Sequence, residues 1–121
     1  MHSISALVLT YNEEDYIENC LKSIKWVDEI VVIDAYSDDR TTEIAEKYTD
    51  KIYKRKFDNF SSQRNYGLDK MQGDWVLVVD ADERITPELQ KEILDKIKDN
   101  PGIAYRVPRK NYFLGKWIKY C

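Results

Sequence analysis

The sequence is poor in the residues on which several large enzyme classes depend. It contains a single histidine, His2, and two cysteines, Cys20 and Cys121. One terminal histidine provides no general base for a Ser-His-Asp or Cys-His mechanism. The two cysteines lack metal-site spacing and cannot form a disulfide framework, so we expect reduced thiols and a cytosolic setting.

Glycine is also scarce, with four residues in the chain. No Gly-x-Gly-x-x-Gly follows the first apolar stretch and no Gly-Lys-Ser/Thr loop occurs, so neither a dinucleotide site of the Rossmann type nor a P-loop is indicated. No apolar run is long enough to cross a bilayer, and the first residues do not resemble a signal peptide. We therefore expect a soluble chain.

The overall composition is that of an ordinary globular protein. The chain has 121 residues, 43% of them apolar and 34% charged, with a net charge of −3. This length suits one domain with its own core, spanning residues 1–121. The acidic balance gives no support to a nucleic acid partner, although a small anion such as a nucleotide can still bind in a local pocket.

The most informative stretch begins at Gly73 and ends in a group of carboxylates. The apolar run Trp75–Val79 precedes Asp80-Ala81-Asp82-Glu83. A continuous β-branched run predicts a strand buried on both faces, which is typical of a parallel sheet. Asp80 and Asp82 then lie at its carboxyl end, where they can bind Mg²⁺ or Mn²⁺ together with a phosphorylated ligand. The alternative is that Asp82 or Glu83 merely ends a strand before a helix.

The remaining pattern alternates strands and helices. We predict further strands at 4–9, 30–33, 51–54 and 103–107 and helices at 17–24, 42–48, 62–71 and from Pro87 onward. Asn12 is the expected N-cap of the first helix and Gly73 the expected C′ residue of the third. Thr86 should cap the fourth helix, whose apolar stripe consists of Leu89, Ile93, Leu94 and Ile97. Asn100-Pro101-Gly102 reads as a turn, and the aromatic tail 111–121 has little periodicity.

This order predicts an α/β fold with a mostly parallel sheet flanked by helices. Polar groups follow four of the predicted strands, at Thr10-Tyr11, Asp34, Lys54-Arg55 and Asp80-Ala81-Asp82. Because the carboxyl ends of parallel strands meet at one rim, we expect these groups to form one site.

Two of the candidate residues keep structural alternatives. A carboxylate at Asp34 can accept a hydrogen bond from a nucleobase or from ribose hydroxyls, but it can equally cap a turn. Arg64 suits planar bases and phosphates, but a surface arginine can also be only a solvated charge.

Several motifs in this order resemble those of the family 2 inverting glycosyltransferases, and the match covers essentially the whole chain. They are Ile4–Glu14, Val31–Asp34 with Ser37–Thr41, Gln63–Gly67, Asp80–Asp82 and Asn111–Ile118. The similarity is greatest to the bacterial branch that builds lipopolysaccharide core and related surface glycans.

The resemblance implies a GT-A fold that binds a nucleotide-diphosphate sugar, often a UDP-sugar. Thr10, Tyr11, Asn12 and Glu13 would then line the nucleotide pocket, with Asp34 and Arg64 holding the base. Asp80, Ala81 and Asp82 would correspond to the metal-binding Asp-x-Asp motif, with Asp82 as the direct ligand of Mg²⁺ or Mn²⁺. Inversion also requires a carboxylate base that deprotonates the acceptor hydroxyl.

The chain departs from the family pattern at Arg40 and Tyr36, where smaller residues are usual. Family members are also longer, and the acceptor half with the catalytic base normally follows the region present here. We therefore expect an N-terminal, donor-binding part whose base lies outside this chain. The whole enzyme would act on a glycan or lipid-linked acceptor, in the cytoplasm at the inner face of the membrane, with peripheral membrane contact.

Two other functions fit part of the pattern. A sugar-phosphate nucleotidyltransferase has a related fold, but it normally carries a glycine-rich signature where this chain has Thr10–Glu14. A binding or assembly module without catalysis is the second, because the aromatic segment 111–121 would favour self-association.

Overall fold

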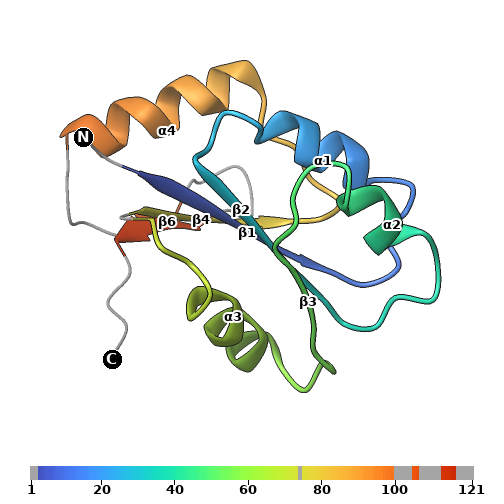
Figure 1. The fold of residues 1–121 in the computed structure, drawn as a ribbon. Helices are drawn as coiled ribbons and strands as arrows, with labels where there is room; N and C mark the ends of the chain where they lie inside the picture. Colours follow the sequence, from blue (N-terminus) through green and yellow to red (C-terminus); the bar gives the residue numbers. More distant parts are fainter. Residues whose placement is uncertain (1–2, 74, 100–104, 107–112, 117–121) are drawn as a thin grey trace.

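The protein forms a single twisted sheet with helices on both faces (Figure 1). The computed structural model describes residues 3–73, 75–99, 105–106 and 113–116, and the side chains of these up to residue 97. The elements are β1 (Ile4–Thr10), α1 (Ile17–Ser23), β2 (Glu29–Asp34), α2 (Thr41–Ala45), β3 (Ile52–Lys54), α3 (Phe60–Leu68), β4 (Trp75–Asp80), α4 (Pro87–Asp99), β5 (Tyr105–Arg106) and β6 (Phe113–Lys116).

The strand order is β3-β2-β1-β4-β6-β5, and β3, β2, β1 and β4 are mutually parallel. Thr10 pairs with Asp34, Asp34 pairs with Lys54, and Leu9 pairs with Asp80. The four carboxyl ends thus lie side by side, which confirms the predicted rim and the α/β fold class.

Alternation along the strands divides the core between the two faces. Ile4, Ala6 and Val8 of β1 face the side covered by α1, α2 and α4, and Leu7 faces the side covered by α3 (Figure 1). In β4, Trp75, Leu77 and Val79 face the first side and Val76 and Val78 the second, and all five are buried. This confirms the strand buried on both faces that the apolar run Trp75–Val79 predicted.

Three local predictions were wrong. The N-cap of α1 is Tyr16, since Asn12 lies five residues before the helix in a loop. Helix α3 ends at Leu68, so Gly73 is not its C′ residue. Leu94 is 42% exposed, because the 13-residue helix α4 buries only the narrower stripe of Leu89, Ile93 and Ile97.

The predicted cap of α4 is confirmed, because the Leu89 N–H donates to Thr86 Oγ1 at 3.2 Å. The strand predicted at 51–54 is β3, which is short and lies at the sheet edge. Tyr105–Arg106 forms an antiparallel edge strand, whereas the other residues predicted for that strand and the turn 100–102 lie outside the described residues. β6 was missed, and it pairs antiparallel with β4.

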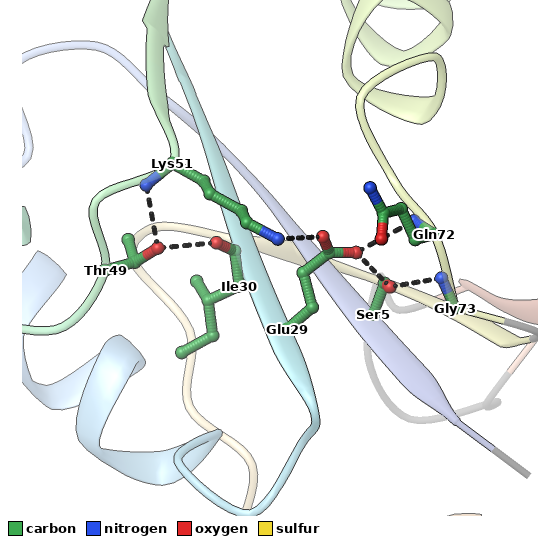
Figure 2. Close-up of polar contacts among 7 residues, drawn as sticks. All are labelled: Ser5, Glu29, Ile30, Thr49, Lys51, Gln72 and Gly73. Carbon is green, nitrogen blue, oxygen red and sulfur yellow. Dashed lines mark hydrogen bonds and ion pairs between the residues drawn. The ribbon is translucent and has the colours of Figure 1, made fainter.

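A buried carboxylate ties the strands together at the opposite, amino end of the sheet (Figure 2). Glu29 accepts hydrogen bonds from the Ser5 hydroxyl at 2.5 Å and from the Gln72 N–H at 2.9 Å, and it pairs with Lys51. The Gly73 N–H donates to Ser5 Oγ at 2.9 Å. A Cβ at Gly73 would meet the Ser5 backbone nitrogen at 2.8 Å, so the glycine permits this close approach.

None of the described helices has the length and apolar character needed to span a membrane.

Candidate active site

A cavity of about 520 Å³ opens at the carboxyl rim of the parallel strands. Its lining comes from the ends of β1, β2 and β4, from the loop before α3, and from α3 itself. The lining residues are Leu9, Thr10, Tyr11, Glu13, Ala35, Phe57, Phe60, Gln63, Asp80, Ala81 and Asp82. The cavity therefore lies where ligands bind in open α/β sheets.

Most of the predicted site residues meet in this cavity. Thr10, Tyr11 and Glu13 line it from the β1 side, and Asp80, Ala81 and Asp82 line it from the β4 side. The remaining three predicted residues, Asn12, Asp34 and Arg64, are not among its lining residues.

Thr10 carries an unused hydrogen-bonding group in the cavity wall. Its side chain is 6% exposed, and its hydroxyl oxygen has no hydrogen-bond partner among the described residues. A buried hydroxyl without a partner costs free energy, about 1–3 kcal/mol. A polar ligand in the cavity would remove that cost.

Three acidic groups converge beside it. One carboxylate oxygen from each of Asp80, Asp82 and Glu83 lies within 4.8 Å of the others. Burial and the charges of Asp82 and Glu83 raise the pKa of Asp80. The pKa of Glu13 is raised by burial and by Asp82, Asp39 and Asp80. Hard carboxylate oxygens are the ligands that Mg²⁺ and Mn²⁺ prefer, so this donor set fits such a cation.

Helix α1 contacts the acidic turn through Cys20. The Cys20 thiol, fully buried, donates to the Asp80 carbonyl at 3.6 Å, and the Glu83 N–H donates to the same oxygen at 3.0 Å. Burial and the nearby carboxylates raise the pKa of Cys20 to about 12. The thiol is therefore neutral at physiological pH and serves packing, as expected for a core-facing cysteine.

The loop after β1 is held by the loop after β2. The Asn12 N–H donates to Ser37 Oγ at 2.8 Å, and the Ser37 hydroxyl donates to Asp34 Oδ1 at 2.5 Å. The Asp38 N–H returns a bond to Asn12 Oδ1 at 2.8 Å. The Glu13 N–H donates to Thr41 Oγ1 at 2.8 Å. We call this set of bonds the loop lock.

The loop lock holds two residues in the left-handed region, Asn12 at φ 51° and Tyr36 at φ 60°. Asparagine tolerates this conformation better than tyrosine, which makes Tyr36 the more strained of the two. Strain of this kind persists only where surrounding contacts enforce it. The loop lock supplies those contacts.

Asp34 is fully buried in this arrangement and also accepts the Ser37 N–H at 2.8 Å. The structural alternative considered for Asp34, a turn-capping carboxylate, is therefore realised. Arg64 is half-buried on α3, whereas its neighbour Gln63 faces the cavity.

Sequence reasoning missed Phe57, Phe60 and Gln63 as lining residues. Phe57 and Phe60 lie in an otherwise polar segment, and isolated aromatics flanking a helix start were the available signal. Gln63 is 2% exposed, and its side-chain amide exchanges hydrogen bonds with Arg55, a contact that the sequence pattern does not indicate.

Comparisons with known proteins agree on one family. The model of the family described as Glycosyl transferase family 2 matches residues 5–120. An uncharacterized glycosyltransferase of Rickettsia bellii is 37% identical over 91 residues, covering 74% of this chain and 31% of that protein. The lipopolysaccharide core biosynthesis glycosyltransferase LpsC of Rhizobium meliloti is 29% identical over 119 residues, covering 93% of this chain and 44% of that protein.

A solved structure of similar sequence shares the fold. S. aureus TarS 1–349 in complex with UDP-GlcNAc matches with a TM-score of 0.68 and 30% sequence identity, covering 88% of this chain and 37% of that one. The chain spans less than half the length of the curated relatives that it resembles, for example 29% of one and 44% of LpsC.

Proposed function

The chain belongs to glycosyl transferase family 2 and has the GT-A architecture, and from this premise we propose that it binds a nucleotide-diphosphate sugar in the rim cavity. The donor would be a UDP-sugar, held with one divalent cation, Mg²⁺ or Mn²⁺. One observation carries the proposal: Thr10, with its unpartnered buried hydroxyl, lines the same cavity as Asp80 and Asp82, two of the three residues whose carboxylates converge. TarS, similar to this chain, binds UDP-GlcNAc, which supports the donor class.

In the proposed complex, Asp82 and Asp80 hold the cation and Ala81 lies beside them in the turn. The cation would neutralise charge on the diphosphate leaving group. Thr10 at the end of β1, and Tyr11 and Glu13 in the loop that follows, would contact the nucleotide. The Thr10 hydroxyl would donate a hydrogen bond to an oxygen of the nucleotide sugar. Asn12 would act through the loop lock rather than by direct contact.

We retain Asp34 and Arg64 as proposed contacts of the base. Each Asp34 oxygen accepts one bond from Ser37, and a carboxylate oxygen can accept a second. Arg64 follows the lining residue Gln63 directly on α3.

The proposed reaction is an inverting displacement. An acceptor hydroxyl oxygen would form a bond to the anomeric carbon while the bond from that carbon to the diphosphate breaks. The hydroxyl proton would pass to a carboxylate base, and the nucleoside diphosphate would leave with the bonding electron pair. We assign the base to no residue of this chain.

For the whole protein, we propose a glycan or lipid-linked acceptor in envelope glycan synthesis at the cytoplasmic face of the membrane. The similarity to LpsC supports this assignment. Recovery of the native protein with membranes after cell fractionation would support it, and full recovery in the soluble fraction would argue against it.

Family membership argues against the sugar-phosphate nucleotidyltransferase considered from sequence. The non-catalytic module and self-association through 111–121 remain predictions. Gel filtration combined with UDP titration separates them, because a stable oligomer without UDP affinity would favour the module.

The direct test is calorimetric titration of UDP into the chain with and without Mn²⁺. We expect wild-type binding that depends on Mn²⁺, and we expect Asp82→Ala to lose that dependence. Asp95→Ala is the matched control, since Asp95 is an exposed acid on α4, away from the cavity. If Asp82→Ala bound UDP with undiminished metal dependence, the metal assignment would be wrong.

A further inference from the structure

Two exposed phenylalanines line the donor cavity at the side away from the acidic cluster. Phe57 is 45% exposed and Phe60 is 68% exposed, yet both line the cavity. Their ring centroids lie 5.0 Å apart with the planes at 71°. Two adjacent apolar rings exposed at a cavity wall form a contiguous apolar surface, and such surfaces often belong to ligand-binding sites.

The loop that carries these rings is fixed by a polar clip. Arg55 Nη1 donates to Asp58 Oδ1 at 3.0 Å and to Gln63 Oε1 at 2.8 Å. The Gln63 amide donates back to the Arg55 carbonyl at 3.0 Å. Asn59 caps α3 by accepting the Ser62 N–H at 2.8 Å. We call the bonds among Arg55, Asp58 and Gln63 the Arg55 clip.

The position of the pair follows from the strand order. Asp80 and Asp82 end β4, whereas Phe57 and Phe60 belong to the loop and helix that follow β3. β2 and β1 lie between β3 and β4 and contribute Ala35 and Thr10 to the cavity. The cavity is therefore acidic at one side and aromatic at the other.

We propose that Phe57 and Phe60, held by the Arg55 clip, form a stacking wall for the nucleobase of the donor. This inference rests on the proposed donor site and adds residues to it. A nucleoside diphosphate is complementary to both sides of this cavity. Its diphosphate would bind the cation at the acidic side, and its planar base would stack on the aromatic side. Stacking of a base on an aromatic side chain is a substantial contribution to nucleotide binding. Arg55 acts on the base only through the position of the two rings.

The test compares UDP with inorganic pyrophosphate, both titrated in Mn²⁺, because pyrophosphate lacks the base. In Phe57→Ala/Phe60→Ala we expect UDP to bind about 5- to 140-fold more weakly, the range that follows from loss of one base–aromatic stack. Pyrophosphate should keep its wild-type affinity. Equal weakening of both ligands, or unchanged UDP affinity, would overturn the proposal.

Two conservative variants separate stacking from simple apolar contact. Phe60→Tyr keeps an aromatic face and should retain UDP affinity, whereas Phe60→Leu should bind UDP more weakly, by no more than the double alanine variant. Arg55→Lys breaks the two-pronged contact and should weaken UDP but not pyrophosphate. Leu94→Ala, an exposed apolar residue on α4, is the control. Wild-type protein that binds no UDP would refute the proposed function, whereas UDP binding insensitive to the phenylalanine variants would refute only this inference.

Discussion

At the scale of single residues, the site is a place where the protein sacrifices stability. Burial of Asp80 and the negative charges of Asp82 and Glu83 raise its pKa. A raised carboxyl pKa means that the folded state disfavours the charged form, so at neutral pH the ionised group destabilises the fold. Thr10 adds an unpaired hydroxyl. Both costs fall when a cation and a polar ligand bind.

The first prediction concerns Asp80→Asn. Without divalent metal, this variant should melt a few degrees above wild type, because it removes one charge from the repelling cluster. Its UDP affinity in Mn²⁺ should fall at least about tenfold, as expected when a charged metal ligand is replaced. Differential scanning calorimetry and UDP titration measure the two effects.

The same variant has a metal response that can contradict the assignment. Mn²⁺ should raise the melting temperature of wild type, since a ligand that binds only the folded state stabilises it, and should leave Asp80→Asn unchanged. An equal Mn²⁺ shift in both proteins would place the cation elsewhere. Asp95→Asn serves as the exposed control.

At the scale of elements, the cavity depends on loops that hold one another. The loop after β1 has few side-chain bonds of its own, and the loop lock fixes it through Ser37 and Thr41. The effect of a residue such as Ser37 on the ligand is therefore indirect.

The second prediction is that Ser37→Ala weakens UDP binding although Ser37 does not line the cavity. The change removes the acceptor for Asn12 N–H and a donor to Asp34. We expect a loss of stability of about 1 kcal/mol and a larger proportional loss of UDP affinity. Urea unfolding and calorimetry provide the two values. Ser61→Ala, an exposed serine on α3, should change neither, and an unchanged UDP affinity in Ser37→Ala would show that the loop keeps its position without the lock.

Helix α3 reaches the sheet through a glycine. A Cβ at Gly67 would lie 2.4 Å from Leu7 Cδ1 and 3.0 Å from Ile33 Cγ1, both in buried side chains of the sheet. This contact sets the height of α3 above the sheet, and with it the position of Phe60 and Gln63.

The third prediction follows for Gly67→Ala. Alanine gains about 1 kcal/mol in a helix, but overpacking a core costs about 1–3 kcal/mol, so we expect net destabilisation. Leu7→Val in the same background should recover part of the loss, because it removes the crowding methyl group. A double-mutant cycle by urea unfolding tests the coupling, and strictly additive effects would contradict it.

At the scale of the whole molecule, function and cohesion lie at opposite ends of the sheet. The carboxyl rim holds the cavity, and the amino end holds the Glu29 network that joins β1, β2, the start of β3 and the segment leading to β4 (Figure 2). Burial raises the pKa of Glu29, but the hydrogen bonds from Lys51, Ser5 and Gln72 outweigh it, and the net pKa is lowered.

The fourth prediction is an acid-dependent loss of stability that comes from Glu29. Because its folded pKa lies below the unfolded one, its contribution is present above the unfolded pKa and is lost as pH falls through the folded pKa. Wild type should therefore lose stability as pH falls below about 4.5, near the unfolded carboxyl pKa, and Glu29→Gln should lose less over that range.

At neutral pH, Glu29→Gln should cost about 1–3 kcal/mol, since its partners lose a charged acceptor. Glu43→Gln is the matched control, because the Arg40–Glu43 pair is exposed on both sides and should contribute little. If the free energy of unfolding depended on pH in the same way in Glu29→Gln and wild type, Glu29 would not contribute to the loss of stability in acid.

The sequence by itself determined the strand–helix order from β1 to α4, the parallel centre of the sheet and the six of nine predicted site residues that line the cavity. These follow from local patterns, because a doubly buried strand is a continuous apolar run and its polar carboxyl end adjoins it in the chain. The acidic turn after β4 is visible from the same pattern.

Only the tertiary structure decided where Asn12, Asp34 and Gly73 act. Asn12 and Gly73 make their defining contacts with segments far away in sequence, Asn12 with Asp38 and Gly73 with Ser5. Asp34 bonds the nearby Ser37, whose hydroxyl in turn accepts the N–H of the distant Asn12. The same holds for Phe57 and Phe60, whose place in the cavity depends on the Arg55 clip and on α3 lying against the sheet. Periodicity reports which face of an element is apolar, whereas such contacts depend on how elements approach one another, which only the packed structure fixes.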